Sequence, residues 1–166
     1  MSEKKKVYEE KLKYDGVFDF KETYSFIYSI ISDWGYALAE KEYSEKSKGE
    51  SKEIEIKWEA NQKVNDYFKF QMKVEWRILG MKDVEIVKDG KKSKKNSGTL
   101  EIKFVAIMIK DYQDKWSDTP FLKFLRAIYD RYIINDIVQQ HEDKVEEELK
   151  EAVSQTKAFL VLESRR

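Results

Sequence analysis

The feature that most constrains this chain is a strict alternation of apolar and polar residues between Phe68 and Ile78. Every even position of this stretch is apolar, and every odd position is charged or carries an amide. Because successive side chains of an extended strand point to opposite faces, such a strand has one apolar and one solvated face. The same parity recurs at residues 54–58, 84–86 and 100–108. The sequence therefore predicts an antiparallel sheet with one wet face, whose other face is covered by helices from the two ends of the chain.

Local signals predict where the individual elements lie. Strands are expected at residues 7–14, 36–45, 52–62, 66–79, 82–88 and 99–112. The stretch 36–45 also contains helix-favouring residues, and we prefer the strand because of its place beside a hairpin turn. Asp19 followed by Glu22 is typical of a capping box at a helix start, and Gly35 suits the end of that helix. After Pro120 the chain is helix-compatible to residue 162, with a candidate break at Asn135.

These elements predict an α+β fold, with a curved antiparallel sheet of about six strands, one helix after the first strand, and a long C-terminal helix or helix pair. We expect residues 1–135 to form this unit. Residues 136–166 are a helical extension, either part of the same domain or a dimerisation element. A chain of 166 residues is long enough to bury a single core.

From Val7 to Tyr132, the order of elements resembles the helix-grip fold of the START/SRPBCC superfamily, which includes Bet v 1-like proteins. In that superfamily the sheet wraps around the last helix and leaves a deep apolar cavity for lipids, steroids or polyketides. The resemblance rests on element order rather than on a motif. This chain departs from the family by having one clear helix, not two, between its first two strands, and by the helical residues 136–166 after the closing helix.

The apolar wall and the resemblance together predict a non-catalytic binding protein. Its ligand, an apolar small molecule or lipid, is expected between the sheet and a helix over residues 119–133. The predicted lining residues are Trp58, Phe68, Phe70, Met72, Trp76, Phe104, Met108, Tyr129 and Tyr132. The alternative is that these side chains are simply the core.

A lysine-rich segment predicts a competing function. Five lysines lie in a stretch that reads as a long hairpin tip, namely Lys88, Lys91, Lys92, Lys94 and Lys95. Such a tip could contact the phosphates of RNA or of a ribosome. The other interpretation is a solvated turn in which lysine protects the sheet edge.

Catalytic and cofactor motifs are missing from the sequence. It has one histidine, His141, no cysteine, and no phosphate-binding or nucleophile motif. We therefore expect a non-enzyme with no cofactor and no metal site. Lys plus Arg and Asp plus Glu balance at 32 each, which argues against a general polyanion binder.

The composition also bears on location. No apolar run is long enough to span a membrane, and the first residues lead into no signal core. We expect a soluble, cytoplasmic protein, and the abundance of Lys and Glu without Cys leans towards a thermophile.

The last helical stretch carries a thin apolar stripe with steps of three and four residues. Its members are His141, Val145, Leu149, Ala152, Thr156 and Phe159. Such a stripe is typical of a coiled-coil seam, and it predicts a homodimer paired through residues 137–160. The alternative is that this helix lies along the sheet of its own chain.

Overall fold

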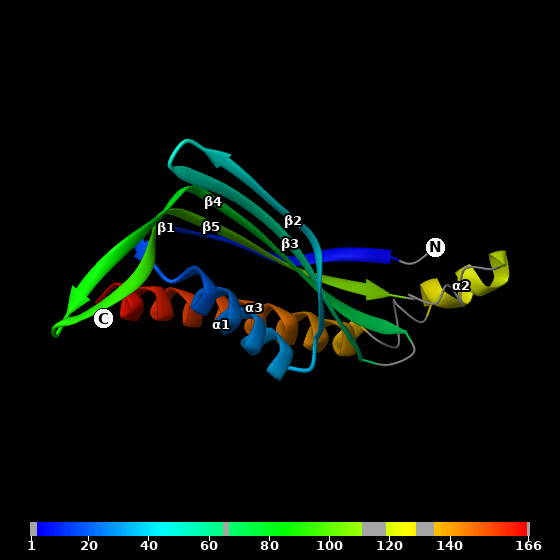
Figure 1. The fold of residues 1–166 in the computed structure, drawn as a ribbon. Helices are drawn as coiled ribbons and strands as arrows, with labels where there is room; N and C mark the ends of the chain where they lie inside the picture. Colours follow the sequence, from blue (N-terminus) through cyan, green and yellow to red (C-terminus); the bar gives the residue numbers. More distant parts are fainter. Residues whose placement is uncertain (1–2, 65–66, 111–118, 129–134, 166) are drawn as a thin grey trace.

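The computed structural model describes residues 3–64, 67–110, 119–128 and 135–165. In this part of the chain, one sheet of five antiparallel strands carries two helices on its inner face (Figure 1). The elements are β1 (Glu3–Phe18), α1 (Phe20–Asp33), β2 (Ala37–Lys48), β3 (Ser51–Lys63), β4 (Phe68–Lys88), β5 (Lys91–Lys110), α2 (Pro120–Ile128) and α3 (Asn135–Arg165). The sheet order is β1-β5-β4-β3-β2. This α+β arrangement is compatible with a helix-grip fold, and the stretch 36–45 is a strand as predicted.

The sheet has five strands rather than about six because the predicted strands 66–79 and 82–88 are one strand, β4. Gly80 lies between them with a φ of 61°, and the pairing with β5 shifts register between Leu79 and Lys82. A glycine with positive φ in this position makes a bulge, which bends a strand without ending it. The sequence signal at Gly80 was real, but it marks a bend and not a turn.

The lysine-rich segment is also more regular than predicted. Both strands continue to the tip of the β4–β5 hairpin, where only Asp89 and Gly90 form the turn, with φ values of 53° and 76°. Two consecutive positive φ values are typical of a type I′ hairpin turn. The lysines therefore lie on paired strands and not on a long loop.

The first helix begins and ends where the sequence predicts. The Asp19 side chain accepts a hydrogen bond from the backbone N–H of Glu22 at 3.1 Å, and Gly35 follows the helix with a φ of 92°. The helix buries Ile27 and Ile31 against the sheet. The Asn96 side chain of β5 accepts from the Phe20 N–H at 3.0 Å, which fixes the start of α1 to the sheet.

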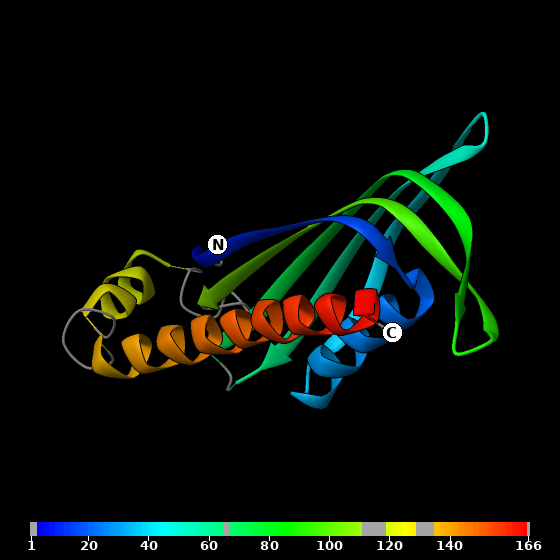
Figure 2. The ribbon, with the colours of Figure 1, turned by 90° about the vertical axis from the view of Figure 1, so that its left-hand side faces the viewer.

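The described part of the helix predicted over residues 119–133, α2 (Pro120–Ile128), does not cover the sheet, because α3 occupies that place. α3 contacts β1, β5 and α1, whereas α2 lies beyond the end of the sheet (Figures 1 and 2). In the structure the apolar face of α3 is wider than the predicted stripe, because Val153 and Leu160 are buried beside it. A wide apolar face is what a core-facing helix needs. Tyr129 and Tyr132 lie outside the described residues.

The predicted dimer stripe is packed inside the protomer. Val145, Leu149 and Thr156 are fully buried and Ala152 nearly so. The other two members contact rings: Phe159 stacks on Phe26 of α1 at 4.3 Å between ring centroids, and the His141 ring lies 5.5 Å from that of Phe68 and 5.9 Å from that of Phe70. The structure thus has the helix lying along its own sheet. The buried side chains are not available to a seam unless α3 leaves the sheet.

Candidate functional site

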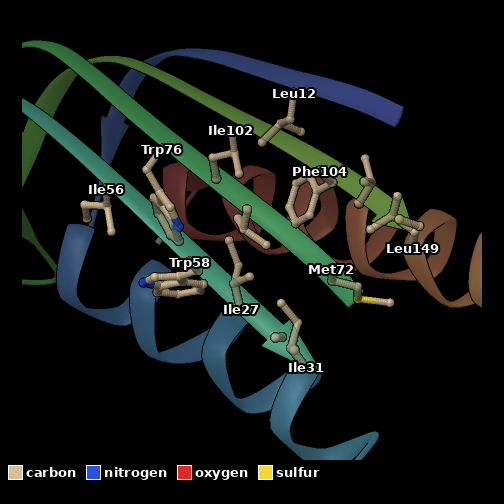
Figure 3. Close-up of a cluster of buried hydrophobic side chains, with 14 of the residues drawn as sticks. Leu12, Ile27, Ile31, Ile56, Trp58, Met72, Trp76, Ile102, Phe104 and Leu149 are labelled. Atoms are coloured by element: carbon tan, nitrogen blue, oxygen red, sulfur yellow. The ribbon is translucent and has the colours of Figure 1, made fainter. Parts of the chain in front are cut away.

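The predicted ligand wall belongs to the buried core, in which Figure 3 labels Trp58, Met72, Trp76 and Phe104. Its seven described members, Trp58, Phe68, Phe70, Met72, Trp76, Phe104 and Met108, are each at most 2% exposed. Two of them differ from the rest. The indole nitrogens of Trp58 and Trp76 are buried and make no hydrogen bond. Leaving a buried donor unpaired costs about 1–3 kcal/mol, so this pair requires an explanation that the other wall residues do not.

The two indoles belong to an aromatic cluster between the sheet and α1, formed by Phe20, Tyr24, Tyr28, Trp58 and Trp76. The indole rings lie 5.2 Å apart, and the Tyr24 ring meets that of Trp58 edge-on at 4.7 Å. Tyr28 lies 6.0 Å from Trp58, and Phe20 lies 6.2 Å from Trp76. Figure 3 shows the two indoles side by side above α1. Such edge-to-face contacts stabilise aromatic clusters beyond simple burial.

The edge strand β2 adds two polar side chains to the rim of this cluster. Glu40 pairs with Trp58 across the sheet and Tyr43 pairs with Ile56, with a register shift between Glu40 and Glu42. On a regular strand, residues 40 and 43 would face opposite sides of the sheet, because they are an odd number of positions apart. A bulge inserts one extra residue between them, so that both face the same side. The bulge therefore turns both Glu40 and Tyr43 towards the inner face, where Trp58 lies.

An open hollow of about 410 Å³, which we call the α1–β2 hollow, lies over the cluster. It is lined by Phe20, Lys21, Tyr24, Ser25, Glu40 and Tyr43. The Tyr24 hydroxyl donates a hydrogen bond to the Glu40 carboxylate at 2.9 Å. Burial, and then this hydrogen bond, raise the pKa of Tyr24 above its usual range. The Trp58 N–H is close enough to oppose that rise in pKa, but it forms no well-aligned hydrogen bond.

The hairpin lysines line a different hollow, of about 330 Å³, between the hairpin and the start of α1. Its lining is Asp19, Glu22, Lys88, Lys91, Ser93, Lys94 and Lys95. Lys92 is exposed on the same hairpin. Two carboxylates therefore face the predicted phosphate contacts, and they offset part of the positive charge.

A third hollow, of about 260 Å³, lies on the solvated face of the sheet. Its charged lining consists of Lys11, Glu55, Lys57, Glu75, Arg77, Glu101 and Lys103. Opposite charges alternate across the strands, as in the pair Lys11–Glu101 at 3.4 Å. Exposed pairs of this kind contribute little stability, and the four cations and three carboxylates of the lining leave a net charge of only +1 to select a ligand.

The one histidine of the sequence, His141, lies against the apolar core. Burial, followed by the nearby Lys144, lowers the pKa of His141, and its ring rests against phenylalanines. No three His, Asp or Glu side chains in the described ranges are placed to share a metal ion. Among the described helices, none has the length and apolar content that crossing a membrane requires.

Sequence reasoning predicted two members of the aromatic cluster as ligand contacts but none of the residues that line the α1–β2 hollow. Trp58 and Trp76 were predicted as ligand contacts, whereas Glu40 and Tyr43 were not. The i, i+4 pair of Tyr24 and Tyr28 on the predicted helix was the available signal. Comparisons with known protein families, with curated proteins and with solved structures found no match to this chain.

Proposed function

We propose that this protein is a non-catalytic binding protein for a flat aromatic molecule, and that the α1–β2 hollow with its aromatic cluster is the binding site. The observation that carries the proposal is the pair of buried indole N–H groups without partners at Trp58 and Trp76. Small-molecule sites are mostly apolar, with a few convergent polar groups that fix orientation. The aromatic cluster supplies the apolar surface, and the two indoles supply donors.

The polar groups define the class of ligand. An indole donates but cannot accept, so the ligand must carry an acceptor such as a carbonyl or a ring nitrogen. Tyr24 lies between the hollow and Trp58, and its hydroxyl is held by Glu40. Binding therefore requires the Tyr24 ring to turn aside and release Glu40. The hollow is also lined by Lys21, whose charge is offset by Glu40, so the lining does not require a charged ligand.

A ligand at this site fits the small-molecule binding of the helix-grip proteins that the element order resembles. We propose membership of the START/SRPBCC superfamily on that basis. The ligand's place is then different from the predicted one, because it lies beside α1 and not beneath the closing helix. The tight burial of Phe70, Met72 and Phe104 supports this choice.

The test compares two flat compounds, coumarin with a carbonyl acceptor and naphthalene without one, by their effect on the thermal midpoint and by titration. Trp58→Phe and Trp76→Phe keep an aromatic ring but remove the donor. Each should weaken coumarin binding about fivefold, the value of one ordinary hydrogen bond, and leave naphthalene unchanged. Trp34→Phe, at the end of α1 and outside the cluster, is the matched control. Equal coumarin affinity in all four proteins would contradict the proposal, as would no binding to the wild type.

A second candidate is contact with RNA phosphates through the β4–β5 hairpin, favoured by the exposure of Lys91, Lys92 and Lys94. Replacing these three by alanine should weaken RNA binding uniformly across sequences. It should also reduce the slope of log affinity against log salt by about one unit per lost contact. The control removes three exposed lysines elsewhere, Lys13, Lys41 and Lys46. If the two triple variants bind RNA equally, the hairpin is not the contact. We place this candidate second because Asp19 and Glu22 line the same hollow and offset part of its positive charge.

A further inference from the structure

We propose that α2 docks this protein on the surface of an anionic lipid bilayer. The proposal is independent of the function assigned to the α1–β2 hollow. It rests on two features at one end of the molecule: the exposed apolar face of α2, and a cationic row on the neighbouring end of the sheet. Both lie at the end opposite the β4–β5 hairpin (Figures 1 and 2).

The first feature is that α2 turns large apolar side chains towards solvent. Phe121 is 67% exposed and Phe124 is 61% exposed, which places them among the most exposed large apolar residues of the described chain. At 100° per residue, Phe121, Phe124, Leu125 and Ile128 fall within one 100° sector of the helix. The helix is thus amphipathic. Its apolar side does not pack on the sheet, because α3 already covers the inner face of the sheet.

The second feature is the charge around this face. The only charged residues in the α2 sequence are the cations Lys123 and Arg126, and Lys123 is exposed. At the adjacent end of the sheet, Lys4, Lys69 and Lys63 form one row across the strands with Ile109 between the first two. The next row outward contains Glu3 and Lys110, so lysines outnumber glutamates four to one over these two rows. Apolar residues next to an excess of cations are typical of helices that lie in the interface of anionic membranes.

This charge pattern favours a lipid surface over a second copy of the chain. The centre of the solvated face of the sheet carries both positive and negative charges, and its apolar residues Val105, Ile107 and Ile109 are half-buried or buried, so they are not open to receive two phenylalanines. A bilayer offers both complements at once. Its headgroups attract the lysines, and its acyl boundary accepts the phenyl rings.

Sedimentation with lipid vesicles tests the proposal on the full chain. The wild type should bind vesicles of phosphatidylcholine with a minority of phosphatidylglycerol, bind less as salt is added, and bind vesicles of phosphatidylcholine alone at least tenfold more weakly. The double variant Phe121→Ser, Phe124→Ser should lose at least tenfold in affinity for the anionic vesicles. Lys123→Glu should weaken binding without removing any apolar surface.

The matched control is the double variant Val87→Ser, Leu162→Ser, which removes two similarly exposed apolar residues, 63% and 56% exposed, away from α2. It should bind like the wild type, and all variants should keep the wild-type thermal midpoint because the changed side chains are exposed. The proposal is overturned if the wild type ignores anionic vesicles, or if the phenylalanine variant binds them as well as the control does. Light scattering that shows a wild-type dimer, lost only in the phenylalanine variant, would also overturn it in favour of a second copy.

Discussion

Replacing Leu149 by alanine should lower the free energy of unfolding by about 2–5 kcal/mol, the usual cost of removing a fully buried leucine. Leu149 is fully buried and belongs to the core cluster formed by the sheet, α1 and α3. Its side chain lies within that cluster in Figure 3. The loss should be independent of protein concentration, because every contact that Leu149 makes in this structure is within one chain.

Urea unfolding at several protein concentrations measures this effect. Leu162→Ala is the matched control, because Leu162 lies on the same helix but is 56% exposed. It should change stability by no more than about 0.5 kcal/mol. A destabilisation by Leu149→Ala that grows on dilution would show instead that the stripe on α3 pairs two chains, as the coiled-coil interpretation predicts.

Replacing Gly98 by alanine should lower the free energy of unfolding by about 2–4 kcal/mol, because it introduces both backbone strain and overpacking. Gly98 has a φ of 154°, and a Cβ there would lie 2.8 Å from the Leu79 carbonyl oxygen and 3.1 Å from that of Gly80. Both oxygens belong to the backbone of β4 at its bulge, so neither can move aside without disturbing the pairing of β4 with β5.

The control for this substitution is Gly49→Ala in the β2–β3 turn. Gly49 also has positive φ, at 61°, but a Cβ there would meet nothing within 4 Å. Gly49→Ala should lower the free energy of unfolding by only about 1–2 kcal/mol, the strain of placing a side chain at positive φ. Thermal or urea unfolding of the two variants separates crowding from strain. Equal costs would mean that the close approach of β5 to the β4 bulge does not constrain residue 98.

The elements that could be predicted from the sequence are those with a local cause. The alternation from Phe68 to Ile78 predicts a half-buried strand, and Asp19 with Glu22 predicts the start of α1, because each signal acts within a few residues. Gly80 shows the limit of this reasoning, since one glycine suits a turn and a bulge equally well. Only the pairing of β4 with β5 on both sides of Gly80 decides between them.

The choice of covering helix could not be predicted for a related reason. Both the stretch around Phe121 and the stretch around Leu149 are amphipathic, and periodicity does not say which of two such helices meets the sheet. Packing decides in favour of α3, which is the longer helix and buries Val145, Leu149, Val153 and Leu160 in the core.

The candidate site was least accessible to sequence reasoning. Trp58 and Trp76 were predicted as ligand contacts from strand parity alone. Glu40 joins them only because a bulge interrupts β2, and Tyr24 joins them because α1 crosses the sheet at that point. Neither relation is encoded in local spacing, because each depends on contacts between elements that are distant in the sequence.

The indole N–H resonances of the ¹⁵N-labelled full chain test the proposed binding site most directly. The sequence has four tryptophans, and the resonances of Trp58, Trp76 and Trp34 are assigned by the corresponding phenylalanine variants. On titration with coumarin, we expect the Trp58 and Trp76 indole protons to move downfield, because they acquire the acceptor that they lack in the free protein. The Trp34 resonance should stay in place. If coumarin binds while the Trp58 and Trp76 resonances do not move, or if saturating coumarin moves none of them, the assignment of a ligand site to the α1–β2 hollow is wrong.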